Sequence, residues 1–554
     1  MTIIPLFITT QVVFFLLWYL LKGYFSRKQQ KIKADLSEKW GEEQIGYRDF
    51  DRIGLYNEHL IQDNERDQLT AKSLEDLNIN EVYSKIDRCK TKIGQQYLYY
   101  LLQNPSKDEA ELKRKNRFID LFFNHKELRD ELSYNLLKLN NSLTYFIPNI
   151  IFDWKLKQSK YKYLTLILSL LPLVFLPLSL LYGRYFFGLL FLNFVVNLII
   201  HFKNKAKVEF FISPFSQLPK LINYVQRLSK LDPLFFDEAA LSACDKLKPL
   251  ARYQFLLHSE KPDQNDFSSI VWLLLEYVKI TFLVENNLLD KCIEITNKLR
   301  PEIHELYQFI GNLDSCQSIA SYRTGLDYFC VPDFDDTYTH LDIKAAYHPL
   351  LADCEPNDLK TAAQGLVVTG SNMSGKTTFM RTIALNVIMA QTIYTVCASQ
   401  YKASFFNVFT SIAIQDDILS GRSYYLEEII SIHAFIDQSK STESRNLFVI
   451  DELFKGTNTL ERIAGAKGVL EFLVKNKNMV MVATHDLELA NLLSAEYSLF
   501  HFSEQVENGG YVFDYKIKKG ILQTKNAIRL LELFGYPSAV INSANQYLDS
   551  KMEN

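Results

Sequence analysis

Gly370-Ser371-Asn372-Met373-Ser374-Gly375-Lys376-Thr377 has the complete pattern of a phosphate-binding loop. The uncharged run from Leu366 to Thr369 before it predicts a buried strand, and the residues from Thr378 to Leu385 after it predict a helix. In this context backbone N–H groups can close around phosphates at a helix N-terminus. We therefore expect residues 370–378 to bind a nucleotide, with Lys376 at the β- and γ-phosphates and the Thr377 hydroxyl on Mg²⁺.

Two further apolar runs end in residues that suit nucleotide hydrolysis. Asn446 to Ile450 leads into Asp451-Glu452, and Val482-Ala483-Thr484 leads into His485. In P-loop enzymes an Asp at this place binds Mg²⁺, and the adjacent Glu can take a proton from the attacking water. The imidazole of His485 can sense the γ-phosphate by hydrogen bonding. The predicted catalytic residues are Glu452, Lys376 and His485, and the predicted Mg²⁺ ligands are Thr377 and Asp451.

The segment from Gln415 to Ser423, between the loop and the acidic strand, allows two alignments. Leu419-Ser420-Gly421 faintly resembles the Leu-Ser-Gly-Gly-Gln element of transporter ATPases, whereas Ser423 followed by Tyr424 and Tyr425 offers a second alignment. A small polar residue at a helix start could bind the γ-phosphate of a neighbouring subunit's nucleotide, although many such residues are only helix caps.

Length, charge and cysteine usage exclude several classes of protein. A chain of 554 residues is too long for one hydrophobic core, so two to four domains are expected. The net charge of −3 gives no global basic field, so DNA contacts would need a local patch. The seven cysteines contain no Cys-x-x-Cys pair, which argues against structural zinc and a disulfide framework.

The first apolar segment, Ile3 to Leu21, carries no charge and is long enough to cross a bilayer. The competing reading is a cleaved signal peptide, but no basic region precedes the segment. Basic residues follow it directly, at Lys22, Arg27 and Lys28. The positive-inside rule then places the N-terminus outside and predicts an uncleaved anchor over residues 1–26.

A second apolar block, Tyr163 to Phe202, is interrupted only at Tyr182-Gly183-Arg184. It is long enough for two helices joined by a tight turn, and lysines flank it on both sides. Both flanks are therefore expected in the cytoplasm, with residues 161–203 as a transmembrane hairpin. A buried helical hairpin in a soluble core is the alternative.

The remaining sequence divides by its hydrophobic period. Residues 27–160 and 204–335 show apolar spacing near 3.6, which predicts a cytoplasmic helical region and a helical lever region. From residue 336 to 554, short apolar runs alternate with helices, at Gly365 to Val368, Leu447 to Ile450 and Met479 to Ala483. This alternation predicts an α/β domain with a mainly parallel sheet covered on both faces.

Together these segments resemble the MutS family of DNA mismatch-repair ATPases. Thr369 to Arg381 is similar to that family's Thr-Gly-Pro-Asn-Met-Gly-Gly-Lys-Ser-Thr-Tyr-Met-Arg, and Asp451 to Thr459 is similar to its Asp-Glu-Leu-Gly-Arg-Gly-Thr-Ser-Thr. Asp416 to Ser423 resembles its Asp-Asp-x-x-x-Gly-x-Ser element. More loosely, Ile86 to Gly94 resembles the start of the family's helical core, and Gly535-Tyr536-Pro537 resembles its C-terminal helical tail.

The resemblance implies an ABC-type P-loop ATPase domain preceded by an all-α core and lever region. It implies ATP and Mg²⁺ as ligands, and a homodimer in which Ser423 reaches the partner's nucleotide. It also implies double-stranded DNA as a partner, although no Phe-x-Glu motif occurs before residue 60 and the mismatch-reading, connector and clamp regions have no counterpart. The expected protein is a multi-pass protein of the bacterial inner membrane, with bilayer lipid as a further partner and the ATPase domain in the cytoplasm.

Two other classes compete with this reading. A transporter ATPase would use its spans as a translocation path, but three spans with almost no charge offer few polar groups for transport. A scaffold with a degenerate ATPase would not need an intact loop, Asp-Glu pair and histidine. For DNA, the best basic patch away from the membrane segments is formed by Lys85, Arg88, Lys90 and Lys92.

Overall fold

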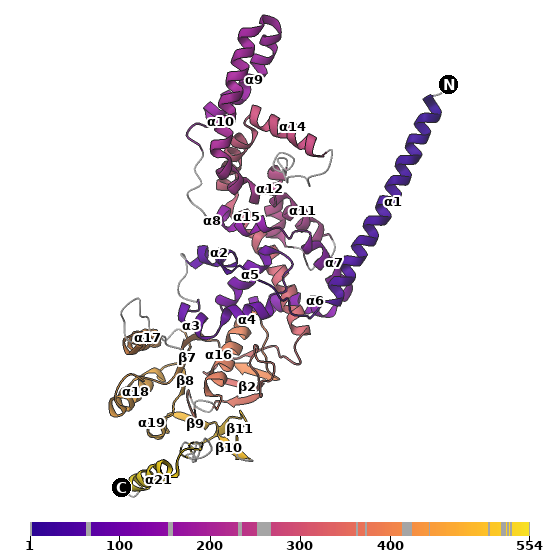
Figure 1. Cartoon of the computed structure of the whole chain (residues 1–554). Coiled ribbons are helices and arrows are strands. Elements are labelled where there is room, and N and C mark those ends of the chain that lie inside the picture. The colour runs from indigo at the N-terminus through magenta and orange to yellow at the C-terminus, as the bar shows by residue number, and fades with distance from the viewer. Residues whose placement is uncertain are drawn as a thin grey trace. The chain divides into compact units, whose positions relative to one another are not determined.

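The computed structural model (Figure 1) describes residues 3–61, 68–152, 159–230, 235, 237–251, 268–361, 364–371, 374–412, 424–441, 444–507, 510–521, 528, 531 and 535–552. The chain forms two compact units. Unit 1 comprises residues 1–63, 87–100 and 118–324, and unit 2 comprises residues 64–86, 101–117 and 325–554.

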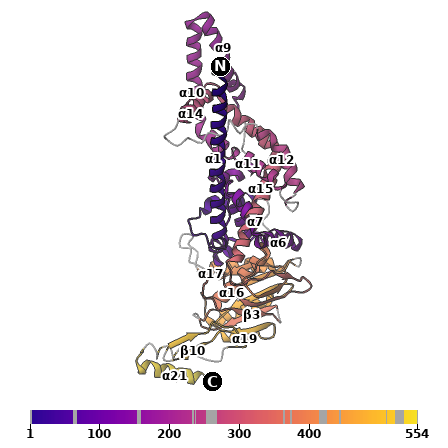
Figure 2. The same cartoon turned by 90° about the vertical axis from the view of Figure 1, so that its right-hand side faces the viewer.

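All regular elements among the described residues of unit 1 are helices, as its hydrophobic period predicts (Figure 2). Two of its helices, α5 and α6, continue into unit 2. Its helices are α1 (Ile3–Glu38), α2 (Phe50–Ile61), α5 (Lys92–Gln103), α6 (Glu109–Asn124), α7 (Lys126–Leu137), η1 (Ser142–Phe146), α8 (Ile147–Phe152), α9 (Lys162–Tyr182), α10 (Arg184–Phe215), α11 (Leu218–Leu228), α12 (Glu238–Ala251), α14 (Ser268–Thr281) and α15 (Val284–Thr324).

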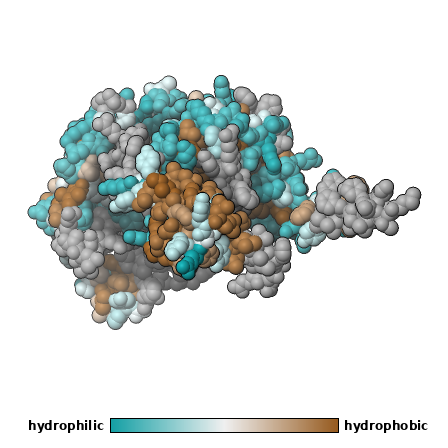
Figure 3. All heavy atoms as spheres, turned by 90° about the horizontal axis from the view of Figure 1, so that it is seen from above, coloured by the Kyte–Doolittle hydropathy of each residue, from teal (hydrophilic) through white to brown (hydrophobic). Residues whose placement is uncertain are grey.

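The predicted hairpin is present as α9 and α10, separated by Gly183 alone. Helix α10 continues to Phe215, beyond the predicted end of the hairpin at residue 203. In the described chain, α9 and residues 184–205 of α10 are the two helices long and apolar enough to cross a membrane, and only 17% of each apolar window is buried. Figure 3, which looks onto the tip of the hairpin, shows hydrophobic side chains gathered there.

The predicted N-terminal span forms the first part of α1. Most side chains between residues 3 and 21 lie outside the described part of the structure, so the anchor stays a prediction. Further along, Lys33 of α1 pairs with Glu131 of α7, and the indole N–H of Trp40, just after α1, donates to the Thr324 hydroxyl at 2.9 Å. These contacts attach the polar end of α1 to unit 1.

A buried carboxylate joins α15 to the start of α5. Asp314, fully buried, accepts hydrogen bonds from the backbone N–H groups of Lys90 and Thr91 at 2.9 and 2.7 Å, and from the Thr91 hydroxyl at 2.7 Å. Gly94 leaves the space that this carboxylate occupies, because a Cβ there would stand 2.2 Å from its Oδ2.

The structure corrects the predicted basic patch. Arg88 is 4% exposed, and its guanidinium donates to the carbonyl oxygens of Glu42 at 2.9 Å and Gly41 at 3.3 Å. Burial also lowers the pKa of Lys90. Arg88 therefore faces the interior of unit 1 and does not belong to a surface that could follow a phosphate backbone.

The core of unit 2 is a six-stranded sheet in the order β12-β9-β4-β8-β7-β6, in which all neighbouring pairs except β12 with β9 are parallel. The three apolar runs that predict strands are β4, β7 and β8, and all their side chains are buried except that of Asp451 at the end of β7, which is partly exposed. The strands are β4 (Gly365–Thr369), β6 (Asn407–Ser411), β7 (Asn446–Asp451), β8 (Met479–Ala483), β9 (Tyr497–His501) and β12 (Lys518–Lys519).

Helices α17 (Tyr424–Ser439), α18 (Thr459–Leu473) and α19 (Leu487–Leu492) pack with this sheet. Their apolar side chains, including Phe435, Ala466 and Leu470, form one buried cluster with Phe448, Ile450 and Val480 of the strands. Helix α21 (Ser538–Met552) lies near the C-terminus, and β10 (Glu504–Glu507) and β11 (Gly510–Phe513) form a separate antiparallel hairpin.

A second sheet in the order β1-β5-β2-β3 covers the other side of α16 (Lys376–Thr392), the helix that follows the phosphate loop. Because α16 contacts strands of both sheets, nearly its whole length is buried. This burial fixes the start of α16, where the phosphate loop ends. The strands are β1 (Asp333–Phe334), β2 (Leu341–Ala346), β3 (Asn357–Lys360) and β5 (Gln400–Ala403).

Two short helices that the sequence assigns to the helical region, α3 (Ala71–Asp76) and α4 (Ile79–Ile86), belong to unit 2. The reason is a set of buried hydrogen bonds to strand β6. The Asp76 carboxylate accepts from the Thr410 hydroxyl at 2.8 Å and the Ile412 N–H at 3.0 Å, and the Thr410 N–H donates to the Ser73 hydroxyl at 3.2 Å.

Candidate functional site

The phosphate loop connects the end of β4 to the start of α16. Gly370 and Gly375 adopt φ values of 140° and 102°, which residues with a Cβ rarely reach. At Gly370 a Cβ would also stand 2.8 Å from the carbonyl oxygen of Phe502. Between the glycines, the Ser374 hydroxyl donates to the carbonyl of Ser371 at 2.7 Å and closes the turn.

Lys376 is the first residue of α16 and is 3% exposed. Its ammonium group donates to the carbonyl oxygens of Gly370 at 2.7 Å and Ser371 at 2.8 Å. The cation therefore lies inside the loop, at the place where a phosphate oxygen would need a positive charge.

Thr377 and Asp451 meet although 74 residues separate them. The Thr377 hydroxyl donates to Oδ2 of Asp451 at 2.6 Å. They meet because β4 and β7 are parallel strands with β8 alone between them, so both strands end at one edge of the sheet. Burial raises the pKa of the Asp451 carboxyl, against the hydrogen bond from Thr377.

These two oxygens fit a Mg²⁺ ion. Mg²⁺ is usually held by one or two carboxylates together with waters and substrate phosphates, rather than by a cage of protein ligands. The described residues contain no group of three or more His, Cys, Asp or Glu side chains that could hold a metal by themselves. A Thr–Asp pair beside a phosphate loop needs the phosphates to complete the coordination, which is the arrangement that nucleotide-dependent Mg²⁺ binding requires.

Glu452 lies one residue further on, with its backbone in the left-handed region at φ 60°. Its carboxylate contacts Nδ1 of His485 at 2.9 Å and the ammonium of Lys455 at 3.0 Å. Burial by itself would raise the pKa of Glu452, but the hydrogen bonds from His485 and Lys455 outweigh it and hold this pKa below its ordinary value. The group is therefore a carboxylate at neutral pH, and two side chains orient it.

Glu428 of α17 supports the loop that carries Glu452. Its carboxylate is buried and accepts a hydrogen bond from the backbone N–H of Phe454, a residue at φ 59°. Arg462 of α18 forms a two-point ion pair with Asp486, at 2.9 and 3.0 Å. Asp486 follows His485, so this pair fixes the segment that positions the imidazole.

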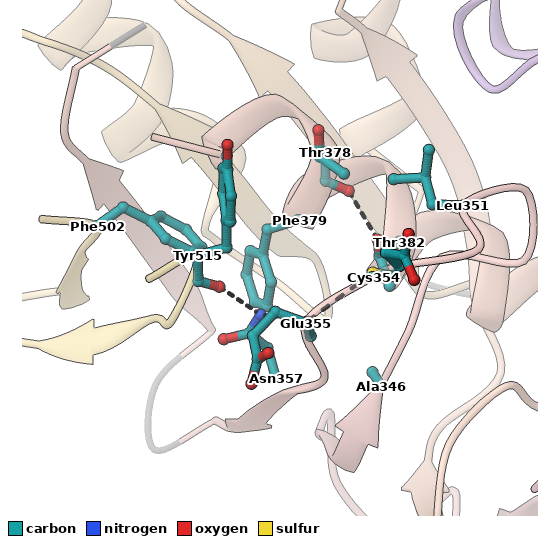
Figure 4. A pocket seen from close by; sticks show the side chains of 12 residues that line it. Ala346, Leu351, Cys354, Glu355, Asn357, Thr378, Phe379, Thr382, Phe502 and Tyr515 are labelled. Carbon is teal, nitrogen blue, oxygen red and sulfur yellow. Dashed lines mark hydrogen bonds between the residues drawn. The ribbon is translucent and has the colours of Figure 1, made fainter. Parts of the chain in front are cut away.

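A cavity of about 310 Å³ opens beside the phosphate loop. Gly375, Thr378 and Phe379 form its wall on the loop side. Figure 4 shows Tyr515 and Phe502 on one side of the cavity and Leu351, Cys354 and Thr382 on the other. Aromatic and aliphatic side chains face the cavity together with the polar side chains of Asp353, Glu355 and Asn357, so a flat ring that carries hydrogen-bonding groups fits it.

Asn357, at the start of β3, holds the segment that carries Tyr515. Its side-chain amide donates to the carbonyl of Tyr515 at 2.9 Å, and its oxygen accepts from the Ile517 N–H at 2.8 Å. The Tyr515 ring lies against Gly375, where a Cβ would stand 3.1 Å from it. Tyr515, Cys354 and Asn357 carry no motif, and sequence reasoning missed them.

Of the predicted site residues, the structure brings together Lys376, Thr377, Asp451, Glu452 and His485 at one sheet edge. Asn372, Met373 and Ser423 lie outside the described residues. Helix α17 begins at Tyr424, directly after Ser423. The next residue, Tyr425, packs on the Glu452 loop, because a Cβ on Gly456 would stand 2.9 Å from its Cβ.

Comparison with known proteins finds one family in this part of the chain. Residues 366–552 match the family model of MutS domain V. The curated protein DNA mismatch repair protein MutS of Geobacillus sp. (strain WCH70) is 31% identical over 317 residues, which cover 54% of this chain and 36% of the relative. The protein of the same name from Fusobacterium nucleatum is 25% identical over 521 residues, 84% of this chain and 56% of the relative.

The MutS protein of Natronomonas pharaonis is 30% identical over 264 residues, 46% of this chain and 30% of the relative. The chain thus spans between about a third and somewhat over half the length of these relatives. The resemblance that the motifs indicate is confirmed, and it includes the phosphate loop, the Asp-Glu strand and the histidine described above.

Proposed function

We propose that this chain, a MutS-family protein whose residues 366–552 form domain V, binds and hydrolyses ATP while attached to a membrane. The observation that carries the ATPase part is the meeting of five side chains at one sheet edge. Thr377 lies 2.6 Å from Asp451, and Glu452 lies 2.9 Å from His485, next to a loop that already encloses the Lys376 cation.

The nucleotide would lie with its phosphates in the loop and its base in the adjoining cavity. Lys376 would exchange the carbonyls of Gly370 and Ser371 for phosphate oxygens, and N–H groups at the start of α16 would add to the binding. The base would enter between Tyr515 and the apolar wall near Leu351 and Cys354. Aromatic stacking on Tyr515 then supplies orientation and affinity.

Hydrolysis needs a group that takes a proton from the attacking water. Glu452 suits this role because its lowered pKa keeps it deprotonated and because His485 and Lys455 hold its carboxylate in place. Thr377 and Asp451 would hold Mg²⁺, which neutralises charge on the phosphates when bound. Lys376 would stabilise the charge that develops on the transferred phosphoryl group.

A Glu452→Gln variant tests this proposal. We expect ATP hydrolysis to fall by about 100-fold or more, since general-base catalysis contributes 10²–10⁴-fold, with ATP affinity retained. Glu488→Gln, on the exposed surface of α19, is the matched control and should hydrolyse ATP at the wild-type rate. Turnover of Glu452→Gln within a few-fold of wild type would overturn the assignment of the base.

The membrane part rests on the exposed apolar side chains of the hairpin. A helical hairpin in a soluble core would be mostly buried, whereas only 17% of either apolar window in α9 and α10 is buried. Leu173 and Val174 on α9 and Phe187 and Phe191 on α10 are between 52% and 64% exposed. Such surfaces are stable in hydrocarbon and unfavourable in water.

Membrane insertion is tested by thiol labelling in intact cells and after permeabilisation. Arg184→Cys, at the turn of the hairpin and exposed, should react with a membrane-impermeant maleimide from outside in a Cys330→Ser, Cys354→Ser background. Lys298→Cys, on the exposed face of α15, should react only after permeabilisation. Equal reaction of both positions in intact cells, or protection of both, would contradict a spanning hairpin.

Binding of double-stranded DNA is the second candidate function, because the matched relatives are DNA mismatch repair proteins. Electrostatic binding to phosphates should weaken steeply with salt, and mismatch recognition should add a preference that salt does not remove. A gel-shift titration of the detergent-solubilised protein with matched and mismatched duplexes separates the two. Equal binding to both duplexes would leave the chain without mismatch recognition.

A further inference from the structure

Helix α14 has the opposite distribution of side chains from a helix on the surface of a water-soluble protein. Its apolar side chains face outward and its charged side chains face inward. Leu273, Leu274, Leu275, Tyr277 and Val278 are between 41% and 62% exposed. Its two charged residues face inward instead, since the side chains of Glu276 and Lys279 are 16% and 10% exposed. A helix in contact with water shows the opposite distribution, so this arrangement indicates an apolar environment outside α14.

The inward charges are neutralised within unit 1. Glu276 lies 3.6 Å from Lys279, and Lys279 lies 3.1 Å from Glu285 at the start of α15. His201 of α10 lies between the two carboxylates, 3.8 Å from Glu276 and 3.9 Å from Glu285. Lys205 adds a contact with Glu276 at 3.8 Å. Charges that pair in this way allow the outer face of the helix to lie against hydrocarbon.

Helix α14 packs directly on the hairpin, as Figures 1 and 2 both show. The rings of Tyr277 and Phe194 stack with centroids 6.1 Å apart, and the Asn197 side chain donates to the carbonyl of Thr281 at 2.8 Å. Phe194 precedes Lys203, the first lysine after the apolar block, by about 13 Å of helix. The apolar surface of the hairpin therefore continues onto α14 at a depth within one leaflet, about 15 Å thick.

We propose that α14 is an in-plane membrane helix, with its exposed apolar face inserted into the cytoplasmic leaflet beside the hairpin. This inference rests on the proposed membrane attachment and adds a third kind of lipid contact to it. The charged cluster of α14, α10 and α15 then lies at the membrane–water boundary, where amphipathic helices place their polar side. Only Phe282 and Leu283 separate α14 from α15, and α15 ends at Thr324, directly before unit 2 continues at Gly325. The helix proposed to contact lipid is thus connected directly to α15, the long helix that leads to the nucleotide-binding unit.

Spin labels on single introduced cysteines test the proposal in the full chain, reconstituted into vesicles of phosphatidylcholine and phosphatidylglycerol. Of the seven native cysteines, Cys330 and Cys354 are partly exposed and the other five are buried, so Cys330→Ser and Cys354→Ser provide the background. The labelled positions are Leu274→Cys and Val278→Cys on α14, Leu173→Cys on α9 as the lipid reference, and Lys298→Cys on α15 as the water reference. Collision rates with oxygen and with a water-soluble nickel chelate report lipid and water, respectively.

We expect labels at 274 and 278 to show high oxygen and low nickel collision rates, as the label at 173 should. High nickel collision at 274 and 278, with 173 still in lipid, would overturn the assignment of α14 and leave the hairpin intact. Low collision rates with both reagents at 274 and 278 would mean that protein, such as a second copy of the chain, covers the face, which also overturns it. High nickel collision at 173 would instead overturn membrane attachment itself.

Discussion

Glu452 combines a left-handed backbone, a half-buried carboxylate and two orienting partners, and such a combination is stable only where the surroundings impose it. A non-glycine residue at φ 60° costs of order 1 kcal/mol. The cost is offset by the Glu452 N–H bond to Ala483 O at 2.9 Å and by the contacts of the side chain with His485 and Lys455. Neighbouring Phe454 repeats the left-handed backbone, with its N–H held by Glu428. The loop after β7 thus holds the Glu452 carboxylate in one orientation, next to His485 and one residue after Asp451.

In this arrangement His485 contributes to catalysis by orienting the Glu452 carboxylate. A His485→Ala variant removes the 2.9 Å contact with Oε1 and leaves the carboxylate oriented by Lys455 alone. We expect kcat for ATP hydrolysis to fall by about 10-fold, less than in Glu452→Gln, with KM for ATP nearly unchanged. His433→Ala, on the exposed face of α17, is the control. A drop in kcat as large as that of Glu452→Gln would show that His485 contacts the reacting groups itself.

His348, between β2 and the cavity, predicts a pH dependence of stability. Burial, helped by the charge of Arg381, lowers the pKa of His348 to about 4, and its Nδ1 accepts a hydrogen bond from the Leu350 N–H at 3.2 Å. The unfolded chain takes up this proton near pH 6.5, and the folded chain only near pH 4. The stability contributed by the neutral His348 is therefore complete above pH 6.5. It is lost as the pH falls towards 4, by about 3 kcal/mol in total.

His348→Gln removes that titration and keeps an acceptor near Leu350. Urea titrations at pH 7 and pH 5 should show a smaller loss of unfolding free energy for the variant than for the wild type. If both proteins lose the same amount between these two pH values, His348 is not buried in its neutral form.

Which site residues the sequence reveals depends on where they lie along the chain. Asp451, Glu452 and His485 lie at or just after the ends of apolar strands, and Lys376 and Thr377 follow such a strand through the phosphate loop. Parallel strands bring these positions to one edge of the sheet. Tyr515 and Cys354 come from irregular segments whose place depends on Asn357 and on the second sheet. No spacing rule connects these segments to the loop, so only the folded structure shows that they line the cavity.

At the scale of elements, the docking of α3 on β6 shows that a helical period in the sequence does not determine which element a helix packs against. The pattern of residues 71–86 predicts helices but contains no information on their partner. The partner is determined by two buried polar side chains, Ser73 and Asp76, which accept hydrogen bonds from backbone N–H groups at the end of β6. Strand β6 ends at Ser411, and Asp76 binds the next N–H, that of Ile412. The segment that contains Ser423 follows Ile412 in the sequence. The hydrogen bond from Ile412 to α3 therefore fixes the position at which this segment begins.

Asp76→Ala should therefore destabilise unit 2. The variant leaves the buried Ile412 N–H and the Thr410 hydroxyl without their carboxylate acceptor, which should cost about 2–4 kcal/mol. Glu75→Ala, on the exposed side of the same helix, should cost less than about 0.5 kcal/mol. Urea denaturation of both variants measures the difference. Equal stability of the two would mean that α3 is not docked through Asp76.

At the scale of the whole molecule, the two units are interleaved along the chain. The backbone passes between them at 63/64, 86/87, 100/101, 117/118 and 324/325, and two of these passages lie within α5 and α6. The sequence predicts consecutive domains, because hydrophobic periodicity reports local structure and not which segments share a core. With several covalent connections, a change in unit 2 on the proposed nucleotide binding would have more than one route into the helices that carry the apolar hairpin.

The homodimer that the resemblance to the MutS family implies predicts a complementation that no monomer can show. If Ser423 of one subunit completes the nucleotide site of the other, Lys376→Ala and Ser423→Ala each inactivate both sites of their own homodimer. In a mixed dimer one site combines an intact loop with an intact Ser423, and the other site carries both defects. Random mixing in equal amounts makes about half of the dimers mixed, with one of two sites working, so about a quarter of wild-type ATP hydrolysis should return.

The measurement is steady-state ATP hydrolysis after co-expression of the two variants with different affinity tags and purification through both tags in succession. Doubly purified dimers are all mixed and should reach about half of the wild-type rate, because each has one composite site of two. A mixture of Lys376→Ala with Glu452→Gln is the matched control and should stay inactive, since both defects lie in the subunit's own half of the site. Activity of the Ser423→Ala homodimer near the wild-type rate would place each complete site within one chain. An inactive mixed dimer would mean that Ser423 serves the nucleotide of its own subunit.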